Sequence, residues 1–473
     1  MPYILTDEQQ DIISYASTAP AGSVLAVEAV AGASKSYTLL KTAQALPHTW
    51  QMYLCFNKDN ADEARTNFPH YTECRTTSSL AVSPVVHHGL SIEGVVGSKR
   101  TITTDFTYRD IKEDLTYDEK LWVLDDFNRY CTSSAIEHSD NKYVQKYFNL
   151  MVDKKIPCTF GFCLKMYHIL LYKGCITFNT PYDLIMFDEF QDVNECTIEI
   201  LKLLPANIKI VVGDSAQSVY SFNHCINGFK YLDNISATKS LSQSFRCSVA
   251  IADKVESFCQ RHIDQDFVFK GTEHSNTTIH THAILARTNS ALIEYMITFM
   301  KSGTQFMLTK KSSEVFATVL TLMNMKQGAT IYADNMKYIK KDMDYYYKHP
   351  AIQTKHGSCL KYINYLHGSK DKNIEIAFRT IITHGASIIY EVYKYIKALE
   401  EKKIRYPITL STAHASKGFT FDEVTLVDDF PLKDIIEVPI KDQDPSMAEE
   451  LRLYYIACTR AKHKLNNATY INK

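Results

Sequence analysis

The chain has 473 residues, of which 45% are hydrophobic and 22% charged, and its formal net charge at pH 7 is −1. The composition is that of an ordinary globular protein, and the length suggests roughly three domains, or two large ones with insertions. The neutral balance argues against a global basic field, although a basic groove on a neutral protein is compatible with a nucleic-acid partner.

The twelve cysteines show no metal-binding or secretory pattern. The closest pair, Cys158 and Cys163, is separated by four residues, and no C-x-x-C occurs. This spacing disfavours zinc or iron–sulfur ligation and favours buried thiols in a reducing compartment. No apolar run reaches the ~18 residues needed to span a bilayer, and the N-terminal residues do not resemble a signal peptide. These features predict an intracellular protein, cytoplasmic or nuclear, without a membrane partner.

The first part of the chain predicts a strand, a tight loop and a helix. Residues 23–29 predict a short buried strand, and residues 35–46 continue with helical spacing. Residues 51–56 predict a second strand, followed by a helix that ends before Pro69. A loop between a strand and a helix is the context in which a phosphate-binding loop occurs.

This loop matches the phosphate-binding pattern G-x-x-x-x-G-K-[ST] only at its end. Ala29 and Ser34 replace the two glycines, whereas Lys35 and Ser36 are in place and Gly32 remains where the chain must turn. If position 34 requires a positive φ, a serine there costs roughly 1 kcal/mol relative to glycine. The loop therefore predicts an NTP site that is weakened but not abolished.

Further strands are expected later in the chain. Residues 182–190 and 207–214 each predict a strand that ends in polar residues, and residues 279–288, 406–412 and 422–429 predict strands of a second α/β unit. Strands that alternate with helices indicate parallel sheets, whose functional residues gather where the strands end. Two mostly helical stretches, at about 97–155 and 310–403, interrupt the two units.

Carboxylates, a glutamine and two arginines carry the predicted chemistry. In the segment FDEFQD, Asp188 is placed to hold Mg²⁺ and Glu189 to orient or deprotonate a water; a solvated acidic turn is the alternative. Gln217 is a candidate sensor of a γ-phosphate. Arg246 and Arg460 are candidates to stabilise charge on a transferred phosphoryl group from a second domain, with a surface or ion-pairing role as the alternative.

Ten segments follow one another along the chain: LTDEQQ, AVAGASKS, CFNK, TTSSLA, FDEFQD, VGDSAQSVYSF, LSQSFR, ILARTN, STAHASKGFTF and EELRLYYIACTRA. In this order they resemble the motifs of the superfamily 1A DNA helicases of the UvrD/Rep/PcrA type, from Leu5 to Ala461. The details of CFNK, LSQSFR, ILARTN and CTFGFCLK resemble the F-box DNA helicase subgroup, although no F-box segment is visible.

The resemblance implies an α/β fold with two RecA-like P-loop NTPase domains that contain parallel sheets. Each domain would be interrupted by a mostly helical inserted subdomain. The first, ATP-binding domain would comprise residues 1–96 and 156–238, with its insert at 97–155. The second would comprise residues 239–309 and 404–473, with its insert at 310–403.

The resemblance also implies ATP and Mg²⁺ as cofactors. Lys35 would bridge the β- and γ-phosphates, and Ser36 and Asp188 would hold the metal. Gln9 would hold the adenine edge, and Phe245 would stack on the base. The nucleotide-binding residues would be Gln9, Ala31, Gly32, Ala33, Ser34, Lys35, Ser36, Tyr37 and Phe245. The catalytic residues would be Glu189, Gln217, Arg246 and Arg460.

For single-stranded DNA, the family uses aromatic rings as stacking platforms. The resemblance gives this role to Phe222 and Phe56, with core packing as the alternative for each. Contacts to the DNA backbone, which fix position without reading sequence, or coupling contacts would come from Asn57, Thr77, Arg287 and His414. The implied partners are single-stranded DNA, junctions of single- and double-stranded DNA, and ATP; no protein partner is indicated.

Besides Tyr37, four positions depart from the family pattern. Ser34, Ser78, Asn223 and Thr420 stand where a glycine, a histidine, an arginine and a glutamate are usual. Tyr37 stands where an arginine usually packs against the adenine, and a tyrosine ring can also stack.

The sequence therefore predicts an ATP-dependent 3′–5′ DNA helicase or single-strand translocase that acts in repair, recombination or replication. One alternative is a helicase-like DNA-binding or remodelling factor that lost turnover through Ser34. A second is an RNA-directed helicase. A helicase–nuclease is disfavoured, because 12 residues follow Ala461.

Overall fold

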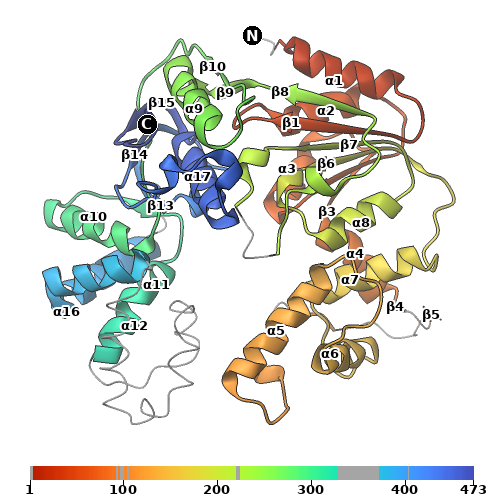
Figure 1. Cartoon of the computed structure of the whole chain (residues 1–473), viewed down its shortest axis with the longest axis horizontal. Coiled ribbons are helices and arrows are strands. Elements are labelled where there is room, and N and C mark those ends of the chain that lie inside the picture. Colours follow the sequence, from red (N-terminus) through yellow and green to blue (C-terminus); the bar gives the residue numbers. More distant parts are fainter. Residues whose placement is uncertain are drawn as a thin grey trace. The chain divides into compact units, whose positions relative to one another are not determined.

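In the computed structural model the chain divides into two units, residues 1–242 and 243–473. The structure describes residues 4–91, 94–95, 101–103, 106–219, 224–326, 372–402 and 404–473. Figure 1 shows their helices and strands. The division into units falls close to the predicted boundary at residues 238 and 239, and the assignment of the inserted subdomains stays a prediction.

The first unit is built on a parallel sheet. In the described residues, six strands pair in the order β3-β2-β6-β7-β1-β8, and each neighbouring pair is parallel. The strands are β1 (Ser23–Ala29), β2 (Gln51–Cys55), β3 (Thr72–Thr76), β6 (Tyr182–Asp188), β7 (Ala206–Gly213) and β8 (Ala237–Leu241). The strands predicted at residues 23–29, 51–56, 182–190 and 207–214 are confirmed as β1, β2, β6 and β7, which are the interior strands of the sheet.

Helices connect these strands (Figure 1). They are α1 (Asp7–Thr18), α2 (Lys35–Ala45), α3 (Lys58–Asn67), α4 (Thr77–Val82), α5 (Tyr117–Thr132), α6 (Lys142–Val152), α7 (Phe160–Tyr172) and α8 (Glu195–Leu203). Helix α1 packs against α2, while α7 packs against α4, α5 and α8. One apolar core joins the sheet residue Phe187 to Phe127 and Phe148 of α5 and α6. The core of the sheet thus continues into the predicted insert at 97–155.

Two short strands, β4 (Leu90–Ser91) and β5 (Gly94–Val95), form an antiparallel pair beyond α4. Between α4 and β4 the chain forms a single π-helical turn over Ser83–His87.

The second unit contains another parallel sheet. Its described strands pair in the order β12-β13-β11-β14-β15. They are β11 (His282–Ala286), β12 (Met307–Leu308), β13 (Ile408–Thr412), β14 (Phe421–Leu426) and β15 (Ala461–Asn466). The strands predicted at residues 279–288, 406–412 and 422–429 are confirmed as β11, β13 and β14. A separate parallel pair consists of β9 (Gln243–Ser248) and β10 (Lys270–Thr272).

The helices of this unit are α9 (Val249–His262), α10 (Asn289–Ser302), α11 (Ser312–Val315), α12 (Ala317–Lys326), α16 (Lys372–Glu401) and α17 (Pro445–Cys458). Helix α16 packs against α10, α11 and α12, while α9 packs against α17 and β15. Gly385, with φ 75°, interrupts α16. Within the residues that the structure describes, no helix combines the length and the apolar character needed to cross a membrane.

Candidate active site

The predicted phosphate-binding loop connects β1 to α2. Lys35 is the first residue of α2 and Ser34 is its N-cap, with φ 57° and ψ 43°. Gly32 also has a positive φ, 76°. Ser34 therefore lies in the left-handed region that glycine adopts without penalty and serine does at a cost of roughly 1 kcal/mol. The sequence predicts a weakened site only if residue 34 has a positive φ, and the structure has that φ at Ser34.

Replacing Ser34 with glycine is expected to raise ATP turnover, or to lower the ATP concentration needed, by up to roughly fivefold. Glycine adopts the positive φ without a Cβ penalty and lets the loop amides approach phosphate oxygens. Steady-state ATPase assays with saturating single-stranded DNA measure the effect.

A matched control is His48→Gly, because His48 also has a positive φ, 63°, but lies outside the loop, between α2 and β2. This variant relieves a similar backbone strain and is expected to leave ATP turnover unchanged. A Ser34→Gly variant slower than the wild type would mean that the loop has adapted to serine.

The next group of contacts surrounds Asp188, which ends β6 and is fully buried. Its Oδ2 accepts hydrogen bonds from Ser36 Oγ at 2.5 Å and from the Tyr53 hydroxyl at 2.9 Å, and its Oδ1 accepts one from the Glu189 amide at 2.9 Å. Burial raises the pKa of Asp188 and the charge of Glu189 adds to this effect, while Lys35 and the two hydroxyl groups oppose it. A hydroxyl beside a carboxylate is an oxygen donor set that suits Mg²⁺.

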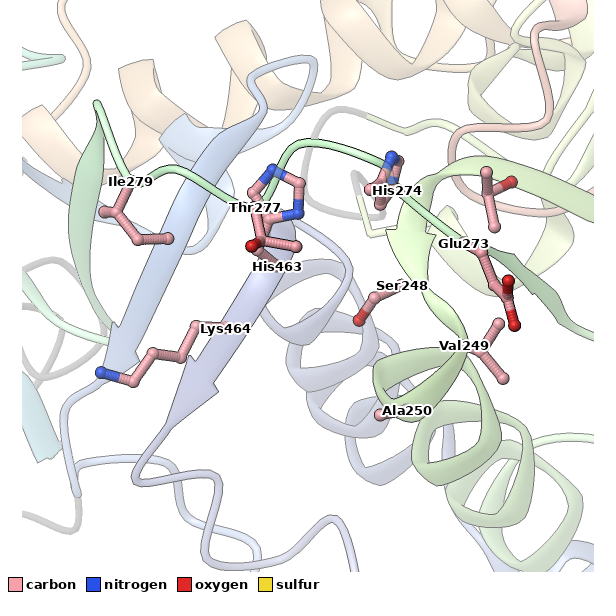
Figure 2. Close-up of a pocket in the computed structure, with 10 residues that line it drawn as sticks. Ser248, Val249, Ala250, Glu273, His274, Thr277, Ile279, His463 and Lys464 are labelled. Carbon is pink, nitrogen blue, oxygen red and sulfur yellow. The ribbon is translucent and has the colours of Figure 1, made fainter.

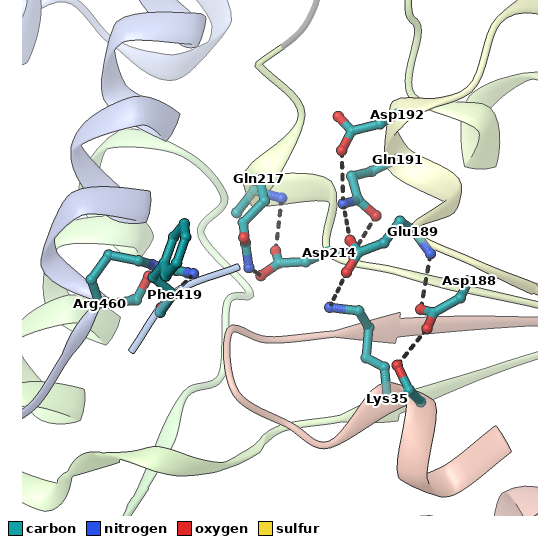
Figure 3. A network of polar contacts seen from close by, with 12 residues as sticks. Lys35, Asp188, Glu189, Gln191, Asp192, Asp214, Gln217, Phe419 and Arg460 are labelled. Atoms are coloured by element: carbon teal, nitrogen blue, oxygen red, sulfur yellow. Dashed lines mark hydrogen bonds and ion pairs between the residues drawn. The ribbon is translucent and has the colours of Figure 1, made fainter. Parts of the chain in front are cut away.

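Glu189 lies beside Lys35. The Lys35 Nζ to Glu189 Oε1 distance is 3.4 Å, and Glu189 Oε2 accepts a hydrogen bond from Gln191 Nε2 at 2.6 Å (Figure 3). Glu189 has φ 59°, a conformation that a non-glycine residue keeps only where its surroundings hold it. The structure thus brings Lys35, Glu189 and Asp188 together at the carboxyl end of the sheet, as the sequence predicts.

Gln191 connects this acidic segment to the end of the neighbouring strand β7. The Asp214 amide donates to Gln191 Oε1 at 3.0 Å, and Gln217 Nε2 donates to Asp214 Oδ2 at 2.6 Å (Figure 3). This approach requires Gly213, because a Cβ atom there would lie 2.3 Å from Gln191 Oε1. A chain of hydrogen bonds therefore runs from Glu189 to Gln217.

The other predicted nucleotide contacts in the first unit lie close to the loop. Gln9 is fully buried, and its Nε2 donates to Thr38 Oγ1 at 2.9 Å. The Thr38 hydroxyl donates in turn to the Ser34 carbonyl at 3.1 Å. Tyr37 is half-buried on α2, with the Lys41 ammonium 5.3 Å from its ring centroid. The contacts of Gln9 and Tyr37 with an adenine stay predictions.

The predicted DNA contacts of the first unit follow β2 and β3, which are neighbours in the sheet. Phe56 is 52% exposed, which excludes core packing for this residue. Asn57 caps α3 with its side chain, and Thr77, the first residue of α4, is buried. Phe222 and Asn223 lie outside the described residues.

Replacing Phe56 with alanine is expected to weaken binding of single-stranded DNA by the loss of one stacked base, roughly 1–3 kcal/mol or about 5- to 150-fold. Trp50→Ala is the matched control, because Trp50 is 41% exposed but precedes the same strand at its opposite end. Fluorescence anisotropy with a labelled oligonucleotide measures both variants. Equal losses in the two variants would contradict a specific role for Phe56.

Arg287 and His414, the predicted DNA contacts of the second unit, follow the neighbouring strands β11 and β13. Arg287 Nε and Nη2, which form one edge of its guanidinium, donate to the two carboxylate oxygens of Glu450 at 2.6–3.0 Å. Burial lowers the pKa of His414 to about 3, and the positive charges of Arg287, Lys310 and Lys417 add to this effect. His414 is therefore a neutral imidazole at pH 7 among cationic groups.

Arg246, Arg460 and Phe245 all lie in the second unit, as the sequence predicts for the two arginines. Arg460 is 1% exposed, which excludes a surface role, and its Nε donates to the Ile456 carbonyl at 2.9 Å. Its Nη1 donates to the Phe419 carbonyl at 3.4 Å (Figure 3). Arg246 and Phe245 are half-buried on β9.

Sequence reasoning missed three groups at this site: Tyr53, Gln191 and Asp214. Gln191 lies in the motif FDEFQD and Asp214 in the motif VGDSAQSVYSF. Their place in these motifs was a signal that could have identified them. Tyr53 belongs to a strand with no polar pattern, and only the pairing of β2 with β6 places its hydroxyl beside Asp188.

The second unit also contains a cavity of about 570 Å³ (Figure 2). Its lining includes Ser248, Glu273, His274, Thr277, His463 and Lys464. The rings of His274 and His463 meet edge to face, with centroids 4.9 Å apart. None of the residues predicted to bind nucleotide or DNA lines this cavity. The cavity is therefore separate from the predicted nucleotide site, which is identified by its polar contacts.

The fold and the site together define a class of protein. In the first unit a parallel sheet carries a strand–loop–helix phosphate site after β1 and a carboxylate after β6, and the second unit repeats the parallel α/β design. This is the RecA-like P-loop NTPase fold.

Two family models match the chain. The UvrD/REP helicase N-terminal domain matches residues 163–230, and the UvrD-like helicase C-terminal domain matches residues 323–471. Models of the N- and C-terminal domains of UvrD-like helicases thus each match a part of this chain, which confirms the resemblance read from its motifs.

Curated relatives give the same result at low identity. "F-box DNA helicase protein 1" of Schizosaccharomyces pombe is 24% identical, over 98% of this chain and 57% of the relative. "F-box DNA helicase 1" of Gallus gallus is 24% identical, over 97% of this chain and 48% of the relative. "Probable DNA helicase II homolog" of Mycoplasma genitalium is 22% identical, over 63% of this chain and 57% of the relative. The chain thus spans about half the length of the curated relatives it matches.

Proposed function

We propose that the chain is an ATP-dependent DNA helicase and single-strand translocase. It uses ATP and Mg²⁺, moves 3′ to 5′, and acts on single-stranded DNA and its junctions with duplex DNA during repair, recombination or replication. The observation that carries this proposal is the cluster of Lys35, Ser36, Asp188 and Glu189 at the carboxyl end of one parallel sheet. The helicase domains matched by the chain support it.

In this proposal each residue has a distinct task. Ser36 and Asp188 would hold Mg²⁺, which would supply neutralisation of phosphate charge. Lys35 exchanges its ion pair with Glu189 for phosphate oxygens. Glu189, held by the Gln191 amide, then accepts a hydrogen bond from the attacking water. The ion pair of 3.4 Å between Lys35 and Glu189 thus couples phosphate binding to release of the base.

Coupling to DNA begins at Gln217. The hydrogen-bonded chain from Glu189 through Gln191 and Asp214 ends at this side chain. Phe222, the predicted stacking residue, follows five residues later in the sequence. A change in the contacts of Glu189 is therefore transmitted through these hydrogen bonds to Gln217, close in the sequence to Phe222. Phe56 supplies a second stacking ring.

The test is ATP hydrolysis by the purified chain with and without single-stranded DNA. Stimulation by DNA is expected, together with unwinding of a duplex that has a 3′ tail and not of one that has a 5′ tail. Single-stranded RNA of the same sequence serves as the competitor that detects an RNA-directed enzyme. Absence of hydrolysis in all mixtures would contradict the proposal.

The positive φ of Ser34 favours a second candidate, a helicase-like DNA-binding or remodelling factor without turnover. This candidate expects single-strand binding by the wild type without hydrolysis. It also expects that Ser34→Gly alone fails to restore activity, because Thr420 and Asn223 depart from the family pattern as well. The ATPase assay of the wild type and Ser34→Gly separates the two candidates.

A further inference from the structure

Tyr53 lies on β2, beside the strand that carries Asp188. In the pairing of β2 with β6, Tyr53 is opposite Met186, two residues before Asp188. The tyrosine is 1% exposed. Its hydroxyl donates to Asp188 Oδ2 at 2.9 Å, and the same oxygen accepts the Ser36 hydroxyl at 2.5 Å.

Packing alone does not require this hydroxyl. The Tyr53 ring packs against Phe68, with centroids 4.7 Å apart. A phenylalanine would make the same ring contact and would bury no polar atom. A buried hydroxyl without a hydrogen-bond partner is costly. The effect of the Tyr53 hydroxyl is therefore expected at its partner, the Asp188 carboxylate.

The contacts of Asp188 fix its carboxylate on both oxygens. The Glu189 amide donates to Oδ1, while Ser36 and Tyr53 both donate to Oδ2. Ser36 is itself a predicted metal ligand, so its hydroxyl serves two groups. Tyr53 reaches Asp188 from a different strand and supplies a donor that does not come from the phosphate-binding loop.

We propose that Tyr53 is a positioning residue of the ATP site, which holds the Asp188 carboxylate in the orientation that binds the divalent cation of the nucleotide. This inference rests on the proposed function. Groups that orient a metal ligand in this way contribute about 10- to 100-fold to metal affinity. Tyr53 acts through Asp188 and touches neither the phosphates nor the reacting atoms in this proposal.

The test is Tyr53→Phe, with Mn²⁺ as the probe in place of Mg²⁺. Electron paramagnetic resonance titration of Mn²⁺ in the presence of ADP is expected to show affinity about 10- to 100-fold weaker than in the wild type. In ATPase assays the Mg²⁺ concentration at half-maximal rate is expected to rise, while the rate at saturating Mg²⁺ changes little. A general loss of stability would not produce this split.

Tyr147→Phe is the matched control, because Tyr147 is also buried in the first unit and donates its hydroxyl to a carboxylate, that of Glu113. It is expected to keep wild-type Mn²⁺ affinity. Tyr53→Met, which also lacks the hydroxyl but fills the space with a flexible side chain, is measured beside Tyr53→Phe in case the latter does not fold.

A double-mutant cycle with Asp188→Asn completes the test. If Tyr53 acts through Asp188, removing its hydroxyl has no further effect on Mn²⁺ affinity in the Asp188→Asn background. Wild-type Mn²⁺·ADP affinity in a folded Tyr53 variant, or full additivity in the cycle, overturns the inference. Absence of nucleotide binding by the wild type itself would instead contradict the proposed function.

Discussion

Replacing Lys35 with alanine is expected to abolish ATP turnover and to leave single-stranded DNA binding largely intact. Lys35 begins α2 and its ammonium lies 3.4 Å from Glu189, with only 11% of its side chain exposed. The variant loses the cation for the phosphates and leaves the Glu189 carboxylate without this partner. Removal of one electrostatic contact to a reacting group costs about 10²–10³-fold in rate, and loss of phosphate binding adds to this.

Lys146→Ala is the control for this experiment. Lys146 is a lysine of the same unit whose ammonium also pairs with a glutamate, Glu113, at 2.6 Å, outside the predicted nucleotide site. Steady-state ATPase assays and oligonucleotide anisotropy are measured for both variants. A normal ATPase rate in Lys35→Ala would mean that the loop does not bind phosphate. A joint loss of DNA binding in a folded variant would mean that Lys35 has a role outside the nucleotide site.

The strands that the sequence predicts are those buried in the middle of a sheet. The apolar runs at β1, β2, β6 and β7 are covered on both faces and contain few polar residues, which makes them recognisable. In the six- and five-stranded sheets, the strands not predicted, β3, β8, β12 and β15, are the edge strands. Edge strands carry polar and charged residues, as in TECRT and AKHKLN, so no apolar run marks them.

The same distinction holds at the candidate site. Lys35, Asp188 and Glu189 are predictable because Asp188 ends a buried strand and the other two follow one, and parallel strands end at one edge of the sheet. The contact of Tyr53 with Asp188 is not predictable, since it depends on which strand lies beside β6. The order of strands in a sheet is a property of the whole fold, and nothing in the local sequence of β2 encodes it.

At Ser34 and Phe56 the structure determines a property that the sequence motif leaves open. The sequence identifies a serine in a glycine position, but only the φ of 57° establishes that the backbone conformation has been kept. For Phe56 the motif left stacking and core packing open, and an exposure of 52% decides against the core. In both cases the missing quantity is a conformation or a surface area, which a residue type does not specify.

The second large effect is expected from Arg246. Replacing it with alanine is expected to slow hydrolysis by about 10³–10⁵-fold, the range for arginines that stabilise a transferring phosphoryl group, with a smaller effect on ATP binding. Arg246 Nη1 donates to the Thr459 carbonyl at 3.3 Å, directly after α17 ends at Cys458. Carbonyls at a helix C-terminus attract cations, and this contact helps to hold the guanidinium in place.

Arg246 gives a cleaner test than Arg460. Arg460 Nη2 donates to the Thr459 hydroxyl at 3.2 Å, and its side chain is almost fully buried. Arg460→Ala therefore combines any loss of catalysis with the cost of an emptied site in the core. Half-buried Arg246 can be truncated with less damage to packing, so its rate effect is easier to interpret.

The control is Arg261→Ala, because Arg261 is an arginine of the same unit that also donates to backbone carbonyls, those of Ser257 and Ile471. It is expected to hydrolyse ATP at the wild-type rate. Rates are measured at saturating ATP and DNA, and ATP binding is measured separately with a fluorescent analogue. If Arg246→Ala hydrolyses as fast as Arg261→Ala, then Arg246 only secures the end of α17, and Arg460 is left as the predicted arginine of the second unit that stabilises charge on the transferred phosphoryl group.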